Sequence, residues 1–72
     1  MKTYMNTGGN SGISGYEFGK DYIDVLFSTG AIYRYSYASA GIDKVEHMKQ
    51  LAEQGCGLNS YIMHYARLDY VK

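Results

Sequence analysis

Two short segments rich in β-branched and aromatic residues, separated by three turn-forming residues, constrain this chain more than any other feature. The first segment covers residues 22–27 (YIDVLF) and the second covers residues 31–37 (AIYRYSY). Between them stands Ser28-Thr29-Gly30, a loop length that is typical of β-hairpins, with a glycine that can adopt the left-handed conformation. The pattern therefore predicts an antiparallel hairpin closed by these three residues.

The length of this loop also predicts which side chains of the hairpin share a face. If Phe27 lies opposite Ala31, alternate residues of both strands point to one side of the sheet. The more apolar side comprises Ile23, Val25, Phe27, Ala31, Tyr33, Tyr35 and Tyr37. The other side comprises Tyr22, Asp24, Leu26, Ile32, Arg34 and Ser36. We expect the first side to face the core, and a slip of one residue would mix the two sets.

The chain before the hairpin is predicted to add one strand or two. Residues 13–18 (ISGYEF) form a strand candidate that ends at Gly19-Lys20-Asp21. Residues 1–12 are expected to be irregular because of their glycine and asparagine content, or to contribute an edge strand at Met1–Met5. The sheet therefore has three strands, or four if the edge strand forms.

Helical periodicity follows the hairpin. Polar residues, Lys49 among them, occupy one face of the predicted helix, and Gly55 is expected at its C-cap. A second short helix is expected to begin with Asn59 or Ser60 as its N-cap. The apolar face of the main helix consists of Ile42, Val45, Met48, Leu51 and Ala52. The 72 residues thus predict a single small α+β domain, an antiparallel sheet packed on one main helix with a short C-terminal helix.

Charge and composition limit the classes of partner. Seven Lys and Arg residues balance seven Asp and Glu residues, so the net charge is zero and any nucleic-acid site must be a local basic patch. No stretch approaches the roughly 18 consecutive apolar residues of a membrane span, and the N-terminal residues do not lead into an apolar signal sequence. Cys56 is the single cysteine, which suits a reducing compartment. We therefore expect a cytoplasmic protein without a membrane partner.

Catalytic and metal sites are not indicated. Cys56 with His47 or His64 offers a nucleophile and a base, but nothing in the sequence places them together or supplies an oxyanion donor. The two histidines lie 17 residues apart and have no second cysteine near them, so a zinc site lacks ligands. We expect no enzymatic activity, no metal and no cofactor, and a small filling role for Cys56 near a turn.

The aromatic run Tyr33-Arg34-Tyr35-Ser36-Tyr37 has two interpretations. It is a stacking platform for unpaired bases, with arginine at the phosphate, or Tyr33 and Tyr35 pack beneath the helix as core residues. The register favours the core interpretation for these two tyrosines and leaves Tyr37 more open. The candidate nucleic-acid residues are Tyr33, Arg34, Tyr35, Tyr37 and Arg67.

The opposite face of the hairpin carries a second candidate surface, formed by Tyr22, Leu26, Ile32 and Arg34. Aromatic residues and arginine are enriched at the centres of protein interfaces, so this cluster favours a protein partner or a second copy of the chain. The alternative is that the N-terminal segment or the second helix covers it.

The hairpin pattern Ile23-x-Val25-x-Phe27-x-x-Gly30-x-x-Tyr33-x-Tyr35 resembles that of the KTSC domain. This family is named after a domain at the C-terminus of some lysyl-tRNA synthetases and includes small free-standing bacterial and phage proteins. The similarity extends from Ser11-Gly12-Ile13 through the helix to Gly57-Leu58-Asn59 and Ile62. This chain has no proline near Ser39, where family members usually carry one, and its main helix is longer.

Two functions follow from these observations. The first is a non-catalytic module that binds RNA or single-stranded nucleic acid, which the resemblance implies and the tyrosines support. The second is a protein-binding adaptor or inhibitor, for example a phage-encoded antagonist of a host defence system, which acts through the other face of the hairpin.

Overall fold

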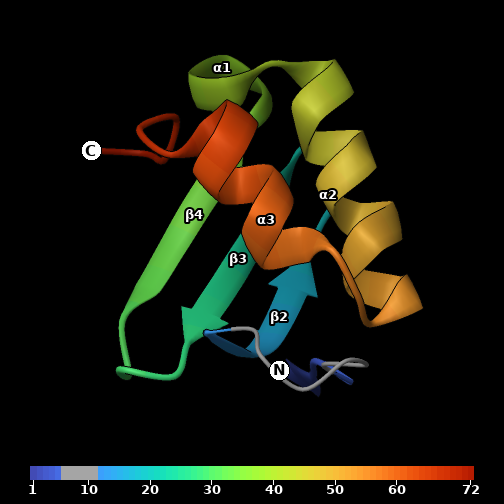
Figure 1. Cartoon of the computed structure of the whole chain (residues 1–72). Coiled ribbons are helices and arrows are strands. Elements are labelled where there is room, and N and C mark those ends of the chain that lie inside the picture. The colour runs from blue at the N-terminus through green and yellow to red at the C-terminus, as the bar shows by residue number, and fades with distance from the viewer. Residues whose placement is uncertain (6–11) are drawn as a thin grey trace.

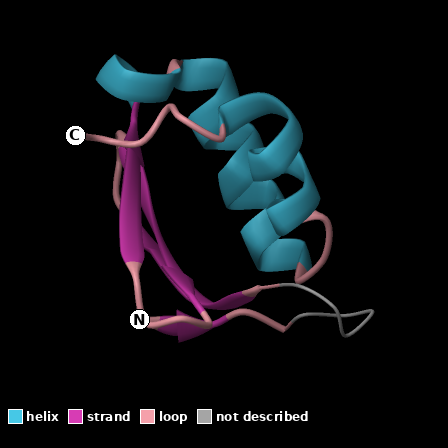
Figure 2. Cartoon of the chain, turned by 60° about the vertical axis from the view of Figure 1, so that its left-hand side comes forward, coloured by secondary structure: helices cyan, strands magenta, loops and turns pink. Residues whose placement is uncertain are grey.

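Four strands form one antiparallel sheet in the order β1-β2-β3-β4, and helices cover one of its faces (Figures 1 and 2). The computed structural model describes residues 1–5 and 12–72. The strands are β1 (Lys2–Thr3), β2 (Ile13–Phe18), β3 (Tyr22–Phe27) and β4 (Ile32–Ser36). The helices are α1 (Tyr37–Ala40), α2 (Ile42–Gln54), α3 (Leu58–Tyr61) and the π-helical turn η1 (Ile62–Ala66). The predicted α+β fold is confirmed.

The hairpin of β3 and β4 has the predicted register. Phe27 N–H donates a hydrogen bond to the carbonyl of Ala31 at 2.8 Å, and Gly30 adopts a φ of 95° in the loop. The glycine is required here because side chains with a β-carbon rarely take positive φ values. The cross-strand pairs are Ile23 with Tyr35, Val25 with Tyr33 and Leu26 with Ile32.

The N-terminal part of the sheet is built on β2. This strand pairs with β3 along its whole length and carries an irregularity between Ile13 and Gly15. On its other side it pairs with β1, where Lys2 lies opposite Tyr16. The optional edge strand is therefore present but reduced to two residues. The expected irregularity of residues 6–11 lies outside the described residues.

The core lies between the sheet and the helices. Val45, Met48 and Ala52 of α2 are buried, as the helical pattern predicts. Ile42 of the predicted apolar face is instead 56% exposed, because it is the first residue of the helix. The buried apolar residues are Tyr4, Ile13, Tyr16, Ile23, Val25, Tyr35, Val45, Met48, Ala52, Leu58, Ile62 and Ala66.

Lys49 corrects the predicted division of α2 into faces, because it is buried rather than on a solvated polar face. Its ammonium group donates to Glu46 Oε2 at 2.7 Å and to the carbonyl of Lys20 at 2.9 Å, and lies 5.5 Å from the centre of the Phe18 ring. The long aliphatic stem can cover apolar surface while the charged end finds polar partners, so burial does not leave the charge unpaired.

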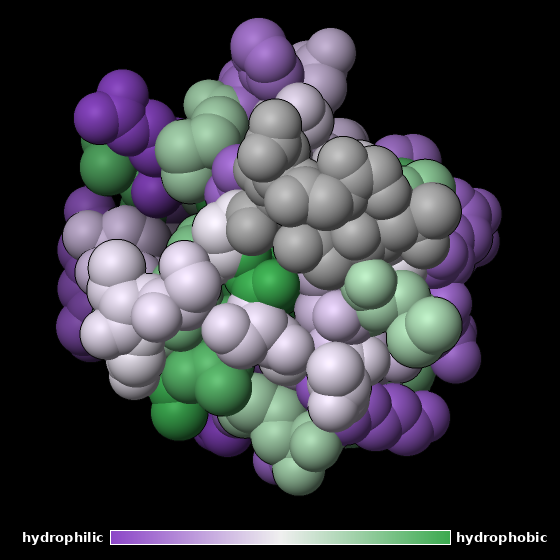
Figure 3. All heavy atoms as spheres, turned by 60° about the horizontal axis from the view of Figure 1, so that its bottom comes forward, coloured by the Kyte–Doolittle hydropathy of each residue, from purple (hydrophilic) through white to green (hydrophobic). Residues whose placement is uncertain are grey.

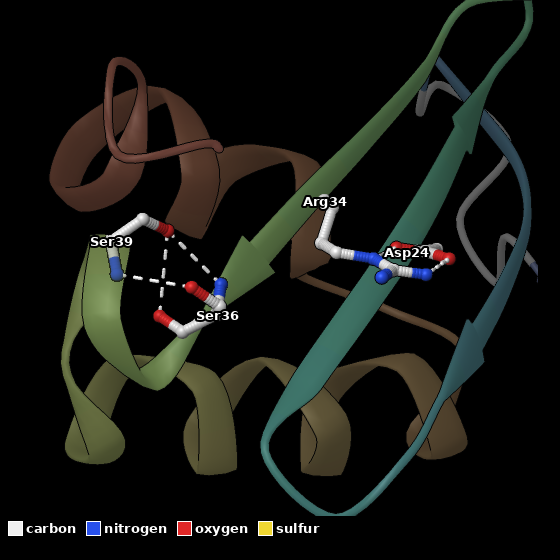
Figure 4. A network of polar contacts seen from close by, with 4 residues as sticks. All are labelled: Asp24, Arg34, Ser36 and Ser39. Carbon is white, nitrogen blue, oxygen red and sulfur yellow. Dashed lines mark hydrogen bonds and ion pairs between the residues drawn. The ribbon is translucent and has the colours of Figure 1, made fainter. Parts of the chain in front are cut away.

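Tyr37 also departs from the prediction, because β4 ends at Ser36 and Tyr37 begins α1. The Ser36 hydroxyl accepts from the N–H of Ser39 at 3.1 Å, and the Ser39 hydroxyl accepts from the N–H of Ser36 at 3.0 Å (Figure 4). This reciprocal capping box turns the chain into a helix although the residues around it have high β-propensity. Tyr37 consequently leaves the strand face that includes Tyr35.

The C-terminal helix begins two or three residues earlier than predicted. Its first residue is Leu58, and its N-cap is Gly57, which supplies no side-chain hydrogen bond, so neither Asn59 nor Ser60 is the cap. The buried N–H of Leu58 instead donates to the Tyr4 hydroxyl at 3.2 Å. Gly55 does form the C-cap of α2 in the left-handed conformation, as expected.

Candidate nucleic-acid interface

A groove of about 410 Å³ lies at the hairpin end of the molecule, between the β3–β4 loop and the residues of η1 and just beyond it. Figure 3 views the molecule from this end and shows apolar residues among pale and hydrophilic ones on the surface. π-helical turns such as η1 are rare and are frequent at functional sites. Its lining includes the side chains of Phe27, Tyr33, Tyr35, Met63, Arg67 and Tyr70.

Three aromatic rings form the wall of the groove. The rings of Phe27 and Tyr33 meet edge to face, with centroids 5.5 Å apart, which confirms that both residues lie on the same side of the sheet. The ring of Tyr70 lies 4.9 Å from that of Tyr33. Tyr33 itself is 39% exposed, so it is not packed beneath the helix as the register alone suggested. In Figure 1 the hairpin end of β4 lies to the side, away from α2 and α3.

Tyr70 reaches the groove because the C-terminal residues are fixed against β4. The N–H of Val71 donates to the carbonyl of Arg34 at 2.6 Å. The Ser39 hydroxyl donates to the carbonyl of Asp69 at 2.7 Å, and the Asp69 carboxylate pairs with Lys44 at 2.6 Å. These contacts hold the backbone on both sides of Tyr70, so the position of its ring does not depend on aromatic contacts alone.

Tyr35 lies at the base of the groove and is only 2% exposed. Burial, with smaller contributions from Tyr33, Tyr70 and Asp69, raises the pKa of its phenol to about 12. The hydroxyl is therefore neutral near neutral pH and remains a hydrogen-bond donor. The core position predicted for this residue is confirmed.

The groove is locally basic in a neutral chain. Arg67 is exposed and forms no ion pair with any other described residue. The ammonium group of Lys72 lies 5.9 Å from the centre of the Tyr70 ring. Asp69 is the acidic residue of this segment, and Lys44 already neutralises it. An anionic group at the groove therefore meets cationic side chains that have no competing partner in the described part of the chain.

The structure separates the other two candidate residues from this groove. Arg34 points to the opposite face of the sheet, where its guanidinium donates to Asp24 and lies 4.1 Å from the centre of the Tyr22 ring. The hydrogen bond to Asp24 raises the pKa of Arg34 further above its usual range. Tyr37 follows the other end of β4 and donates its hydroxyl to Glu46 at 2.6 Å. The groove thus unites Tyr33, Tyr35 and Arg67 of the five predicted residues.

Sequence reasoning did not assign Phe27, Met63 or Tyr70 to a site. The hairpin register does place Phe27 on the same face as Tyr33, so the sequence alone carried enough information to include Phe27 in the site. Nothing in the local sequence indicates that the chain after η1 returns to β4, so Tyr70 carries no signal for a place in this groove.

The residues of the second candidate surface lie on the face of the sheet that carries no helix (Figure 2). Leu26 and Ile32 lie opposite each other, and Ile32 is 58% exposed. The second helix packs on the other face with α2, so it does not cover them (Figure 2). Beside them, Arg34 is held by Tyr22 and Asp24 and is not free for an incoming ligand.

The residues considered for catalysis, Cys56, His47 and His64, are all exposed. The histidine rings lie against tyrosines, His47 at 4.6 Å from Tyr61 and His64 at 6.2 Å from Tyr65. Within residues 1–5 and 12–72, no three His, Cys, Asp or Glu side chains are grouped as a metal site would require. No helix in the same residues has the length and apolar character needed to cross a membrane.

Comparison with known proteins gives no match: no family model, no curated protein and no solved structure corresponds to the chain. The resemblance to KTSC domains therefore stays a prediction. The groove offers flat aromatic surfaces, a neutral hydroxyl donor and an unpaired guanidinium. This combination can bind a ligand that is partly flat and aromatic and partly anionic.

Proposed function

We propose that the chain is a small binding module for single-stranded nucleic acid, RNA in particular, and that the strand binds in the aromatic groove. The observation that carries the proposal is the meeting of Tyr33 and Tyr70, 4.9 Å apart, with the unpaired Arg67 in one groove. The resemblance of the hairpin to KTSC domains supports RNA as the nucleic acid.

Base stacking supplies the first part of the binding energy. Aromatic side chains that stack on unpaired bases contribute about 1–3 kcal/mol per base. The exposed ring of Tyr33 offers such a surface beside Tyr70, and the fixed C-terminal backbone limits the entropy lost when the second ring is held in place. Bases in a duplex have no free faces, so this contribution is confined to single strands.

Phosphate contact supplies the second part, and it is small. Arg67 lines the groove and Lys72 lies beside its Tyr70 ring, so one or two phosphates are neutralised. For a single strand the logarithm of the binding constant then falls with the logarithm of salt concentration with a slope of roughly −1. A neutral chain is compatible with this mode because stacking, rather than counterion release, provides most of the affinity.

Fluorescence anisotropy with short labelled RNA and DNA strands, single and duplex, at two salt concentrations tests the proposal. We expect binding of the single strands, a shallow salt dependence and weak binding of the duplex. Tyr33→Ala and Arg67→Ala should each weaken binding about tenfold or more. Lys20→Ala is the matched control, since it also removes one positive charge, from the turn between β2 and β3 at the other end of the sheet. Absence of binding at low salt, or equal losses in all three variants, would contradict the proposal.

A second function is favoured by the exposure of Ile32 beside Leu26 on the helix-free face. This surface suits a protein-binding adaptor or inhibitor, a phage-encoded antagonist of a host defence system being one example. Ile32→Asp should abolish capture of the partner from a bacterial lysate, or self-association in sedimentation, and leave nucleic-acid binding unchanged. Unchanged capture and unchanged mass would remove this function.

A further inference from the structure

The hydroxyl of Tyr35 has no protein partner among the residues that the structure describes. Tyr35 is only 2% exposed and lines the base of the groove. No hydrogen bond joins its hydroxyl to another residue in the described part of the chain, and no hydrogen bond contributes to its raised pKa. Among the same residues, no fully buried side-chain nitrogen or oxygen lacks a partner, so this hydroxyl retains contact with solvent.

Packing alone does not explain a tyrosine at this position. The ring of Tyr35 fills the core in the way that phenylalanine would, with the Tyr70 ring edge-on to it at 6.4 Å. A hydroxyl that has no protein partner among the described residues and only limited contact with solvent at the base of a groove can complete its bonding through a ligand. The nearest titrating neighbours are Tyr33, Tyr70 and Asp69, and Asp69 is already paired with Lys44.

We propose that the Tyr35 hydroxyl donates a hydrogen bond to the edge of one unpaired nucleobase that enters the groove beside Tyr33 and Tyr70. This inference rests on the proposed function and specifies its ligand, which is a nucleotide whose base is free of a pairing partner. A neutral phenol suits the carbonyl oxygen or ring nitrogen of a base edge, whereas Arg67 suits the phosphate. In a duplex the edge of each base is bonded to its complement and its faces are stacked on neighbouring bases. A paired nucleotide therefore offers neither a free edge to Tyr35 nor a free face to Tyr33 and Tyr70.

The test is a thermodynamic cycle that removes the Tyr35 hydroxyl from the protein and the bases from the ligand, separately and together. The Tyr35→Phe protein and the unaltered protein are titrated with a short labelled single-stranded RNA and with an abasic strand of the same length. Tyr35→Phe should weaken binding of the intact strand by about three- to tenfold and leave binding of the abasic strand unchanged. Tyr65→Phe is the control, because this tyrosine is 64% exposed and lies outside the groove.

The outcomes separate this inference from the proposed function. Equal affinity of Tyr35→Phe and the unaltered protein for the intact strand, while Tyr33→Ala and Arg67→Ala lose binding, would overturn the base contact alone. An equal loss on the intact and abasic strands would also overturn it, because the hydroxyl would then act on the backbone or on the fold. Failure of the unaltered protein to bind any single strand would overturn both proposals. Thermal melting should show that Tyr35→Phe is folded, because the hydroxyl that it removes has no partner among the described residues.

Discussion

Arg34 and Asp24 lie directly opposite each other on β4 and β3, and the guanidinium donates hydrogen bonds to both carboxylate oxygens, at 2.7 Å and 2.9 Å (Figure 4). The two partners differ in exposure. The side chain of Arg34 is 52% exposed and that of Asp24 is 12% exposed. The largely buried carboxylate of Asp24 therefore depends on Arg34 for its hydrogen bonds, whereas the guanidinium of Arg34 is also accessible to water.

This asymmetry predicts that Arg34→Ala is more destabilising than Asp24→Asn. The first change leaves a shielded carboxylate without its donor, whereas the second leaves a guanidinium that solvent can accommodate. We expect Arg34→Ala to lower the melting temperature by several degrees and Asp24→Asn to lower it less, measured by circular dichroism. Arg34→Lys should recover only part of the loss, because an ammonium group cannot form the two parallel bonds.

The same variants separate stability from binding. At a temperature where all of them are folded, their affinity for single-stranded RNA should equal that of the unaltered protein, since Arg34 lies on the face away from the groove. A loss of RNA binding in folded Arg34→Lys would indicate that the RNA binds the helix-free face of the sheet, which contradicts binding in the groove.

The hydroxyl of Tyr4 predicts a second stability effect. Tyr4 is 3% exposed, and its hydroxyl accepts the hydrogen bond from the N–H of Leu58 at 3.2 Å at the start of α3. Tyr4→Phe leaves that buried N–H without its acceptor and should reduce the free energy of unfolding by about 1–2 kcal/mol in urea denaturation. Tyr65→Phe, which removes an exposed hydroxyl, should have no effect, and equal stability of the two variants would show that the Tyr4 bond contributes nothing.

Gly55 and Gly57 form a matched pair for a third prediction. Both have positive φ values, 80° and 81°, so a β-carbon strains either backbone. At Gly55 that carbon would lie 2.5 Å from Cβ of Met5, whereas at Gly57 it would make an ordinary contact, 3.6 Å from Leu51. Gly57→Ala should cost about 1 kcal/mol and Gly55→Ala about 1–3 kcal/mol more, measured by urea denaturation. Equal losses would show that Met5 can move away from the added methyl group without a loss of stability.

Local sequence was sufficient for the hairpin and for most of α2. The loop Ser28-Thr29-Gly30 and the alternation on both sides of it are encoded within a few residues, so the register followed directly. Lys49 could not be assigned to the core in this way, because its partners Phe18 and Lys20 come from the end of β2 and the turn after it, which are distant in sequence. The capping serines on both sides of Tyr37 were visible, but β-propensity pointed the other way, and only the structure shows which effect prevails.

The groove was predictable in part for the same reason. Tyr33 and Tyr35 come from one strand, and the register placed them on one face with Phe27. Arg67 and Tyr70 reach that face because the chain after η1 returns to β4, where Val71 bonds to the carbonyl of Arg34. This return depends on tertiary contacts, Lys44 with Asp69 among them, for which the sequence pattern carries no signal.

The pKa of Tyr35 leads to a prediction at alkaline pH. Burial raises it from the ordinary value of 10.0 to about 12, so between these values the unfolded chain has released this proton and the folded chain still holds it. The folded state then binds more protons than the unfolded state, and the free energy of unfolding falls as pH rises through this window. The contribution of Tyr35 is fully present below pH 10 and should decrease by about 1 kcal/mol midway through the window.

Urea denaturation of the unaltered protein and of Tyr35→Phe at a series of pH values isolates this contribution. The hydrogen bond to Glu46 also raises the pKa of Tyr37, so the unaltered protein loses stability from more than one tyrosine, and the difference between the two proteins belongs to Tyr35. We expect Tyr35→Phe to lose less stability between pH 10 and pH 12, and its tyrosinate absorbance to lack the highest-pH step of the titration. Parallel stability curves for the two proteins would mean that the phenol ionises as freely in the folded chain as in the unfolded one, and that burial does not raise its pKa.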